Sequence, residues 1–487
     1  MANKITFSDG AFLKAMSMEL KKCELDQEAR EHLIRWIDWK YNRVTKKANG
    51  YWKLPAGKKE YLSYLRMLQE LLRIGTSGEI IEECINDYVH YLCMSESRCK
   101  VVVLLPEKST WFAIESIYKA MASDERFEVK LVYIPFPQMD KRENIGIEPY
   151  LEDGIPVLQY TEYDLSKDNP DIVIYSKHYD PVPFQFNIRE VEKIVERVVY
   201  VPYKMEISYN EINYDFQDYL HYRAWRHVGY GPIMKQVGGE YGFRNGENIA
   251  VWGHPKVDYH RADKMYSIPV EWGNKINGRR VLLWCPDYIN PHGSESISTW
   301  FDFSEIVFSQ MEKHKDIVLL WRPHPLFFES LINNYMTQED LNRFLAEKTA
   351  KENIVLDQSE DCRVAFAISD GMICDGTTFF VEYLLTGKPL MLTTKKLESI
   401  YYGEKLRGSI SIGESVEDIE KFINDFAVGR DSKREARREL QQNIFFFPEG
   451  KSVGENIADN ILTDIKKEEM ALVKRLIHYV EKEGGVS

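Results

Sequence analysis

The stretch ISDGMICDGTTFFVEYLLTGKPLML, residues Ile368–Leu392, decides the fold. It begins with a short apolar strand, MIC, and continues through a tight turn, DGTT, into the helical segment FFVEYLLTG. We expect that helix to end at Gly387, because glycine is common just past a helix and Pro389 follows it. A second apolar run, PLML, comes next. A strand, a helix and a strand in such close succession predict a right-handed βαβ unit of a parallel sheet.

The same alternation of strands and helices extends in both directions from this unit. In the carboxy-terminal half the expected strands are residues 281–285, 317–321, 353–356, 372–374 and 389–392. In the amino-terminal half they are residues 101–105, 127–137, 171–175, 197–201 and 248–253. Two successive parallel sheets place a ligand cleft between them, at the carboxyl ends of the strands. The fold class is therefore predicted to be α/β, with two Rossmann-like parallel-sheet domains facing a cleft.

The length of the chain, 487 residues, exceeds what a single hydrophobic core supports. Residues 1–99 carry apolar side chains at helical intervals and predict an amino-terminal helical extension. Residues 100–258 are expected to form the first Rossmann-like domain and residues 278–465 the second, with a charged linker between them. The end of the chain, from about Gly454 to Lys482, is expected to form a long amphipathic helix, and residues 466–487 are set apart as a carboxy-terminal helix beyond the second domain.

Composition narrows the class of protein. The formal net charge of −13 argues against a protein that coats nucleic acid or anionic lipid. The seven cysteines form no C-x-x-C pair and match no zinc site, so reduced thiols fit best. No carboxylate pair or Asp-x-Asp motif appears at the candidate phosphate sites described below, so no metal is expected there. No signal-peptide core or membrane-length apolar run is evident, so we expect a cytoplasmic protein. The basic segment SKREARREL (Ser432–Leu440) leaves open a peripheral contact with the inner face of the cell membrane, the alternative being a solvated helix face.

The start of the helix after DGTT is a candidate anion site. A helix start offers unpaired N–H groups and a positive dipole end, and the hydroxyls of Thr377 and Thr378 add donors there. That combination suits a diphosphate. Glu382 lies one turn further on the same face, within reach of hydroxyls of a bound ribose or glycerol. The alternative is that Thr377 only caps the helix and Glu382 faces water.

Two other strands end in loops with candidate histidines. In IVLLWRPHPLFF, residues 317–328, Arg322 and His324 emerge beside two prolines, and both side chains suit phosphate oxygens. His324 could also protonate a leaving phosphate, the alternative being a packed histidine beside a structural arginine. In VLLWCPDYINPHGSES, residues 281–296, His292 is a candidate contact for phosphate or acceptor, or else a solvated loop histidine.

The order of these motifs resembles that of the CDP-glycerol:polyglycerophosphate glycerophosphotransferase family. The resemblance covers roughly residues 100–452 and leaves the preceding helices without a counterpart. The residues that carry it are Gly253, Pro255, Lys256 and Asp258 at the domain junction, Arg322–Pro325, Ser369–Asp370, Asp375–Thr378, Glu382 and Gly387–Pro389.

The resemblance implies a GT-B-like fold and a transferase that moves glycerol phosphate from CDP-glycerol to a growing teichoic-acid-like polymer, with no cofactor and no required metal. The partners would be a nucleotide-activated donor, bound by the second domain, and a polymer or lipid-linked glycan acceptor on the first. By resemblance the donor-binding residues are Arg322, Asp375, Thr377, Thr378, Glu382, Gly253 and Lys256, and the catalytic candidates are His324, His292 and His178.

His178 enters because the sequence departs from the family. Its members carry a His-Gly-Thr motif after a strand of the first domain, whereas here the strand end reads YVPYK, residues 200–204. His178, in the neighbouring SKHYD, is the alternative acceptor base. The departure also admits CDP-ribitol or a nucleotide sugar as donor. Two other functions therefore stay open: a GT-B glycosyltransferase or nucleotide-sugar epimerase that uses a UDP-sugar, and a non-catalytic scaffold that binds a nucleotide or polymer.

Overall fold

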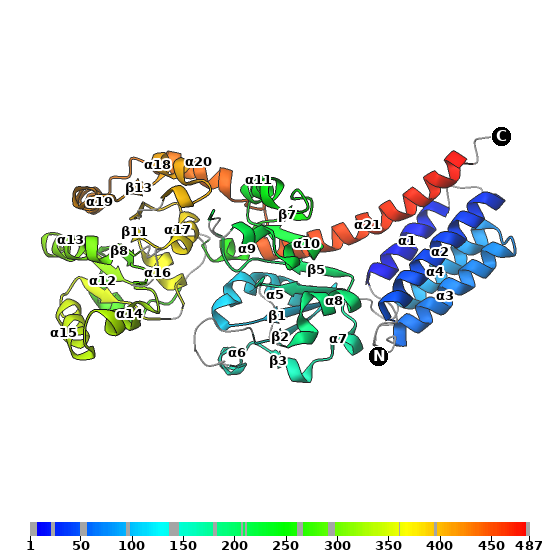
Figure 1. Ribbon diagram of the computed structural model, residues 1–487, viewed down its shortest axis with the longest axis horizontal. Coiled ribbons are helices and arrows are strands. Elements are labelled where there is room, and N and C mark those ends of the chain that lie inside the picture. Colours follow the sequence, from blue (N-terminus) through cyan, green and yellow to red (C-terminus); the bar gives the residue numbers. More distant parts are fainter. Residues whose placement is uncertain are drawn as a thin grey trace.

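The computed structural model describes residues 7–20, 25–48, 56–93, 98–135, 146–178, 183–205, 208–209, 212–260, 266–290, 298–359, 361–393 and 397–483. Three bodies follow one another along the long axis of the molecule (Figure 1). A helical bundle lies at one end, the first sheet and its helices lie in the middle, and the second sheet and its helices lie at the other end.

The first sheet has seven parallel strands in the order β3-β2-β1-β4-β5-β6-β7. Five of them were expected, whereas β3 and β6 were not, because VLQ is too short and RHVG too polar to stand out as strands. The bounds are Cys99–Leu105 (β1), Phe127–Tyr133 (β2), Val157–Gln159 (β3), Ile172–Tyr175 (β4), Arg197–Tyr200 (β5), Arg226–Gly229 (β6) and Ile249–Val251 (β7).

The second sheet has six parallel strands in the order β10-β9-β8-β11-β12-β13. The prediction of an α/β fold with two parallel sheets is thus confirmed, although β13 was missed. The bounds are Arg280–Cys285 (β8), Ile317–Trp321 (β9), Ile354–Leu356 (β10), Gly371–Cys374 (β11), Leu390–Leu392 (β12) and Ser411–Ile412 (β13).

The strand order of the second sheet reverses between β8 and β11. From β8 the chain proceeds outward through β9 and β10, returns to β11 on the other side of β8, and then proceeds through β12 and β13. The loops that leave β8 and β11 therefore diverge, and in open parallel sheets ligands bind at such a point, outside the carboxyl ends of the strands. This topology directs attention to the loops after Cys285 and Cys374.

Helices cover both sheets. Around the first sheet lie Glu115–Ala122 (α5), Glu148–Glu152 (α6), Leu165–Asp168 (α7), Ile188–Ile194 (α8), Ile212–Phe216 (α9), Tyr219–Arg223 (α10) and Pro232–Tyr241 (α11). Around the second lie Val270–Ile276 (α12), Trp300–Lys313 (α13), Phe327–Asn334 (α14), Gln338–Thr349 (α15), Arg363–Ile368 (α16), Thr377–Leu384 (α17), Gly403–Ser409 (α18), Val416–Ala427 (α19) and Arg434–Ile444 (α20). Ser415 and Asp418 form a capping box at the start of α19.

The amino-terminal segment forms a helical bundle with its own apolar core, as expected. Its helices are Phe7–Leu20 (α1), Gln27–Ala48 (α2), Ala56–Arg73 (α3) and Gly78–Cys93 (α4). No described helix combines the length and the apolarity that crossing a bilayer requires.

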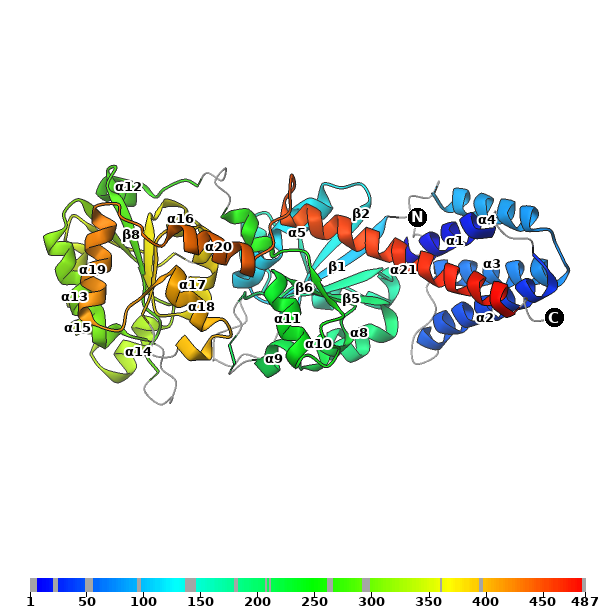
Figure 2. The same ribbon diagram turned by 90° about the horizontal axis from the view of Figure 1, so that it is seen from above.

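A single long helix, Val453–Glu483 (α21), joins the bundle to the first sheet (Figure 2). It confirms the amphipathic helix expected from about Gly454 to Lys482. Buried Glu469 on α21 pairs with Lys40 of α2 at 3.7 Å and with Arg197 of β5 at 3.0 Å. Because both cations are buried with it, the pairing fixes the bundle against the first sheet.

Candidate functional site

The strand–turn–helix unit expected around DGTT is present at the switch point of the second sheet. Gly376 is the N-cap residue of α17, and it has no side chain that could accept from the first N–H groups of the helix. These N–H groups therefore stay available at the carboxyl edge of the sheet. The helix ends at Leu384, a little before the expected Gly387, which lies in the following turn with a φ of +69° that suits glycine. Thr377 and Thr378 open α17, and their side chains lie outside the described part of the chain.

Asp375, just before this helix, binds protein groups. Its Oδ1 accepts the N–H of Asp287 at 2.6 Å, and its Oδ2 accepts the N–H of Thr299 at 2.7 Å and the Thr299 hydroxyl at 3.2 Å. Burial, followed by the nearby charge of Asp287, raises the pKa of Asp375 to about 7. Asp375 therefore ties the loop after β8 and the start of α13 to the start of α17.

Asp287 is a site residue that the sequence analysis missed. It follows β8, and a Cβ atom on Gly376 would lie 3.3 Å from its Oδ2, so the carboxylate sits against the start of α17. Burial raises the pKa of Asp287 to about 6. The expectation that no metal is needed rested on the lack of a carboxylate pair at the phosphate site, and that premise is wrong. The signal that would have found Asp287 is its position two residues after a strand at the switch point.

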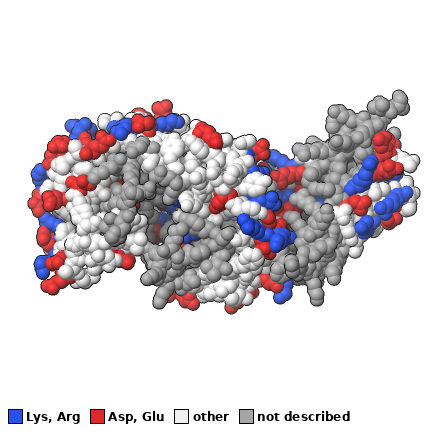
Figure 3. Space-filling model, viewed as in Figure 1, with Lys and Arg blue, Asp and Glu red and all other residues white. Residues whose placement is uncertain are grey.

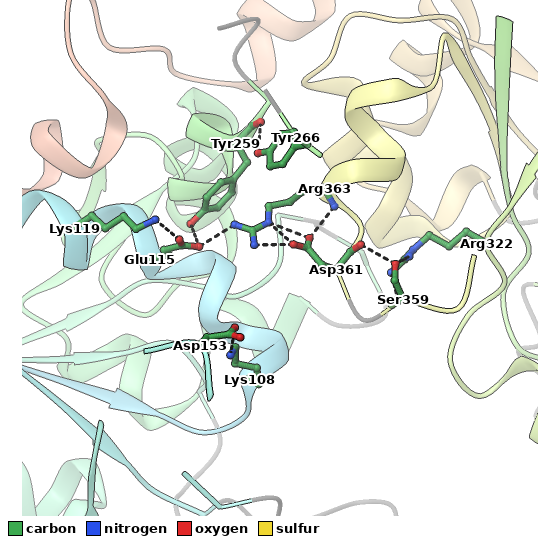
Figure 4. Close-up of polar contacts among 10 residues, drawn as sticks. All are labelled: Lys108, Glu115, Lys119, Asp153, Tyr259, Tyr266, Arg322, Ser359, Asp361 and Arg363. Carbon is green, nitrogen blue, oxygen red and sulfur yellow. Dashed lines mark hydrogen bonds and ion pairs between the residues drawn. The ribbon is translucent and has the colours of Figure 1, made fainter. Parts of the chain in front are cut away.

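Arg322 is engaged inside the second domain (Figure 4). Its guanidinium donates to Asp357 Oδ2 at 2.5 Å, to the Ser359 hydroxyl at 3.0 Å and to the Ser359 carbonyl at 2.8 Å. Arg322 is 6% exposed, and Asp357 follows β10 at the same edge of the sheet. In this arrangement the arginine fixes the loops after β9 and β10 to each other.

His324 is half-buried on the loop after β9. Its Nδ1 accepts the N–H of Leu326 at 3.1 Å, so the neutral ring carries its proton on Nε2. Its backbone N–H donates to the carbonyl of Pro286 at 2.9 Å, and its ring lies 5.0 Å from that of Tyr288. The histidine is thereby anchored to the same loop that carries Asp287.

Glu382 does not face water, because it is 4% exposed beneath the domain junction. Its Oε2 accepts from Lys256 Nζ at 2.7 Å, and its Oε1 lies 3.3 Å from His260 Nε2. Burial alone would raise the pKa of Glu382, but the charge of Lys256 and the contact with His260 outweigh it and lower the pKa. Both carboxylate oxygens are therefore occupied, and the Glu382–Lys256 pair joins α17 to the junction.

The rest of the junction motif anchors α21. Gly253 has a φ of +93°, and a Cβ there would lie 3.2 Å from the carbonyl of Phe446. Asp258 accepts the N–H groups of Val453 at 2.9 Å and Gly454 at 3.1 Å. Gly253 and Asp258 therefore pack against the backbone at the start of α21. Gly253 does not point toward the carboxyl edge of the second sheet.

His178 lies in a cluster of buried histidines in the first domain. Its ring is 5.9 Å from that of His221, which is 5.1 Å from that of His227, and Tyr200 lies 4.9 Å from both of the latter. Burial, then the neighbouring His221 and His178, lower the pKa of His227 well below its usual value. His178 is 8% exposed and follows β4. His292 falls outside the described residues.

Two polar contacts hold the sheet-bearing halves together near the site. Besides Lys256–Glu382, Arg363 of α16 donates to Glu115 of α5 at 3.0 Å and also pairs with Asp361 (Figure 4). Tyr259 donates its hydroxyl to the same Glu115 carboxylate at 3.0 Å. The sequence analysis picked neither Glu115 nor Arg363, whose partners lie far away along the chain.

Among the described residues the edge of the second sheet thus brings together Arg322, His324, Asp375 and Asp287. His178 belongs to the other sheet. No group of three or more His, Cys, Asp or Glu side chains within the described ranges could hold a metal ion. The assembled groups are a helix start, a fixed histidine and a carboxylate of raised pKa, a set suited to binding and protonating a phosphate.

We compared the chain with family models, with curated proteins and with solved structures. Residues 232–463 match the model of the family described as CDP-Glycerol:Poly(glycerophosphate) glycerophosphotransferase. No curated protein matches the sequence at a significant level. A Listeria monocytogenes protein described as a UDP-N-acetylglucosamine 2-epimerase aligns over 76% of this chain and 97% of its own, at 14% identity and a TM-score of 0.52. A histidine-to-asparagine variant of the wall teichoic acid polymerase TagF aligns over 76% and 90%, at 14% identity and a TM-score of 0.51. Both structures share the GT-B-like fold.

Proposed function

Because residues 232–463 match the model of the CDP-glycerol glycerophosphotransferase family, we propose that this protein transfers glycerol phosphate, or a related polyol phosphate, from a CDP-linked donor to a teichoic-acid-like or cell-surface polysaccharide acceptor. The observation that carries the proposal is that Arg322, His324 and the start of α17, all within the matched range, lie at one edge of the second sheet. The likeness of fold alone would serve an epimerase equally well.

In the proposed reaction an acceptor hydroxyl attacks the phosphorus that bears glycerol. A new P–O bond forms to the acceptor, the bond to the bridging diphosphate oxygen breaks, and CMP leaves with that oxygen. The acceptor loses one proton and the leaving group gains negative charge. The protein must therefore supply a base on one side and charge neutralisation or a proton on the other.

On the donor side we place the diphosphate at the start of α17. Its N–H groups and the hydroxyls of Thr377 and Thr378 would hold the phosphate oxygens. His324 carries its proton on Nε2 when neutral and would donate it to the leaving CMP oxygen. Arg322 would add positive charge behind the loop while it keeps its contact with Asp357. Asp375, Glu382 and Lys256 would position these groups, whereas Gly253 serves the start of α21.

On the acceptor side the proposed base is His178, which follows β4 in the first domain. A base must be neutral before it takes a proton. In the same buried cluster the pKa of His227 is lowered well below its usual value, and Asp218 lies 2.8 Å from His221 Nδ1. His292 is the second candidate for the same role.

The test is a thermal-shift screen with CDP-glycerol, CDP-ribitol, CMP, UDP-N-acetylglucosamine and UDP-glucose, followed by an assay of CMP release. A ligand at 100 times its Kd should stabilise the protein by about 2.7 kcal/mol. We expect the CDP-linked polyols and CMP to raise Tm and the UDP-sugars to leave it unchanged. A response confined to the UDP-sugars would favour a glycosyltransferase or epimerase, and binding without turnover would favour a scaffold.

A metal should be dispensable for this reaction. Although Asp287 and Asp375 lie together, both oxygens of Asp375 already accept hydrogen bonds, and the helix start can neutralise the diphosphate. CMP release in EDTA should equal that in added Mg²⁺ within about twofold, well below the 10²-fold that losing a catalytic group typically costs. Activity lost in EDTA and restored by Mg²⁺ or Mn²⁺ would contradict the proposal.

Asp287 should weaken donor binding when it is ionised. Its carboxylate sits against the start of α17, so the negative charge opposes a diphosphate there, and its pKa of about 6 predicts tighter donor binding as the pH falls through 6. Asp287→Asn should tighten CDP-glycerol binding about tenfold at pH 7.5, the equivalent of one pKa unit. It should also reduce the pH dependence between pH 5 and 7, to which Asp375, with a pKa of about 7, contributes as well.

Calorimetry at several pH values measures both effects. The matched control is Asp316→Asn, which removes an exposed carboxylate just before β9, at the opposite edge of the same sheet. Weaker binding by Asp287→Asn would show that the carboxylate contacts a donor hydroxyl or the acceptor instead of opposing the diphosphate.

A further inference from the structure

A separate cavity opens at the amino ends of the second sheet's strands, away from the edge that carries His324 and Asp287. Its volume is about 560 Å³, within the range of small-ligand sites. Arg280 is the first residue of β8, and Asp370 and Pro389 directly precede β11 and β12. The residues that follow α17 and those at the start of α20 complete the lining of the cavity. In Figure 3 charged side chains of both signs lie along the edge where Figure 1 places α18, α19 and α20.

The charges that line this cavity are unbalanced. Four basic side chains face two acidic ones: Arg280, Lys388, Arg434 and Arg438 against Asp370 and Asp431. Both carboxylates already have partners, because Asp370 accepts the N–H of Val281 at 2.8 Å and Asp431 pairs with Arg437 at 2.5 Å and with Arg434 at 3.6 Å. Arg437 is 1% exposed, so it adds a further positive charge behind the wall. The cavity therefore has an excess of positive charge.

The cations of the wall retain hydrogen-bonding capacity. The Arg280 guanidinium stacks 4.8 Å from the Phe426 ring, and within the described part of the chain its buried Nε has no hydrogen-bond partner. Lys388 donates to the carbonyls of Phe366 and Ala367 at 2.8 Å, which leaves one of its three N–H bonds for a ligand. Arg438 is largely exposed, and its ion pair among the described residues is with the exposed Glu435 at 3.2 Å. Bare N–H donors at the rim and base of a cavity suit the oxygens of a phosphate.

The cavity also has an apolar part, which narrows the class of ligand. Phe447, which is 42% exposed, and Leu385 line it beside the cations. An inorganic anion would use the cations alone, whereas an organic phosphate would also cover this apolar surface. We propose that the cavity is a second binding site, for a phosphate ester with a small organic group, either a soluble ester or the headgroup of a lipid.

The site assigned here does not depend on the donor site. It lies at the opposite ends of the strands, and none of its basic residues has a part in the proposed transfer. It also gives the basic segment at residues 432–440 a role, since Arg434 and Arg438 both belong to that segment and to the cavity wall.

Titration calorimetry with sn-glycerol 3-phosphate and co-sedimentation with vesicles test the proposal on the full chain, with CMP present to occupy the donor site. The vesicles contain either phosphatidylglycerol or phosphatidylcholine alone. The variant is Arg434→Gln with Arg438→Gln, two side chains that are about 60% exposed, so the fold should persist. The control is Arg343→Gln on α15, which is 71% exposed.

We expect the double variant to bind the ester at least about tenfold more weakly than wild type, the effect of losing one charged hydrogen bond or more, while the control and CMP release from CDP-glycerol stay unchanged. Binding of the soluble ester without the vesicles identifies a soluble ligand. If the wild type sediments with phosphatidylglycerol vesicles but not with phosphatidylcholine vesicles, and the double variant no longer does so, the ligand is a lipid headgroup. Equal binding by wild type and double variant, or no binding in either arm, overturns the proposal.

Discussion

A His324→Ala variant should release CMP from CDP-glycerol about 10²–10⁴-fold more slowly than wild type, the usual loss when a general acid is removed. The imidazole is held in one orientation by the Leu326 N–H and by the anchoring of its backbone to Pro286, so its proton lies on Nε2. No other described histidine shares its loop. The His324→Ala variant should therefore lack a proton donor at this position, because no neighbouring described histidine can take its place.

Two measurements make this result specific. Calorimetry with CDP-glycerol should show weaker donor binding by about 1.5–3 kcal/mol, the value of a hydrogen bond to a charged group. His314→Ala is the matched control, because His314 follows α13 at the other end of the domain and bonds Asn424 at 2.8 Å. Wild-type turnover by His324→Ala would remove the strongest part of the family analogy and bring the scaffold and sugar-transferase alternatives forward.

The second sheet could be predicted because its elements are local. Its strands are continuous apolar runs, and the turn and helix at DGTT have the glycines at their ends that such elements require. The strands that were missed, β3, β6 and β13, owe their pairing to neighbours rather than to their own composition. A strand as short as Ser411–Ile412 exists because β12 lies beside it.

The individual site residues were harder to predict, because their partners are distant along the chain. Arg322 was identified correctly as a residue at the end of a strand, but its pairing with Asp357 depends on the adjacency of β9 and β10. Asp287 carried no motif of its own. Its raised pKa arises from burial beside the start of α17, which only the folded chain brings to it.

The likeness of fold to a sugar-nucleotide epimerase and to a teichoic acid polymerase shows how little the architecture restricts the chemistry. Both share two parallel sheets with this chain at 14% identity. Three strands of the second sheet end in loops that carry His324, Asp287 and the start of α17, and these groups set what can bind there. The first domain contributes a cluster of three buried histidines, His178, His221 and His227, all outside the range that matches the family model.

Breaking the Glu382–Lys256 pair should lower the free energy of unfolding by about 3–5 kcal/mol, the usual loss when one partner of a buried ion pair is removed. Glu382→Ala leaves the Lys256 ammonium, whose side chain is 13% exposed, without its carboxylate. The double variant Lys256→Met with Glu382→Leu should regain most of that loss, because no charge is then left uncompensated. Urea unfolding followed by tryptophan fluorescence measures all three proteins, with Glu329→Ala on the exposed face of α14 as control.

The dependence on pH separates this structural role from one in binding hydroxyls. The pKa of Glu382 is lower in the folded protein than its ordinary value of 4.5, so the stability that it contributes is present above pH 4.5 and is lost as the pH falls below it. The difference in stability between wild type and Glu382→Ala should therefore shrink in acid. Suppose instead that Glu382→Gln unfolds like wild type at every pH yet binds CDP-glycerol poorly. Glu382 would then serve the donor's hydroxyls, and the pair with Lys256 would be one of two arrangements that the carboxylate adopts.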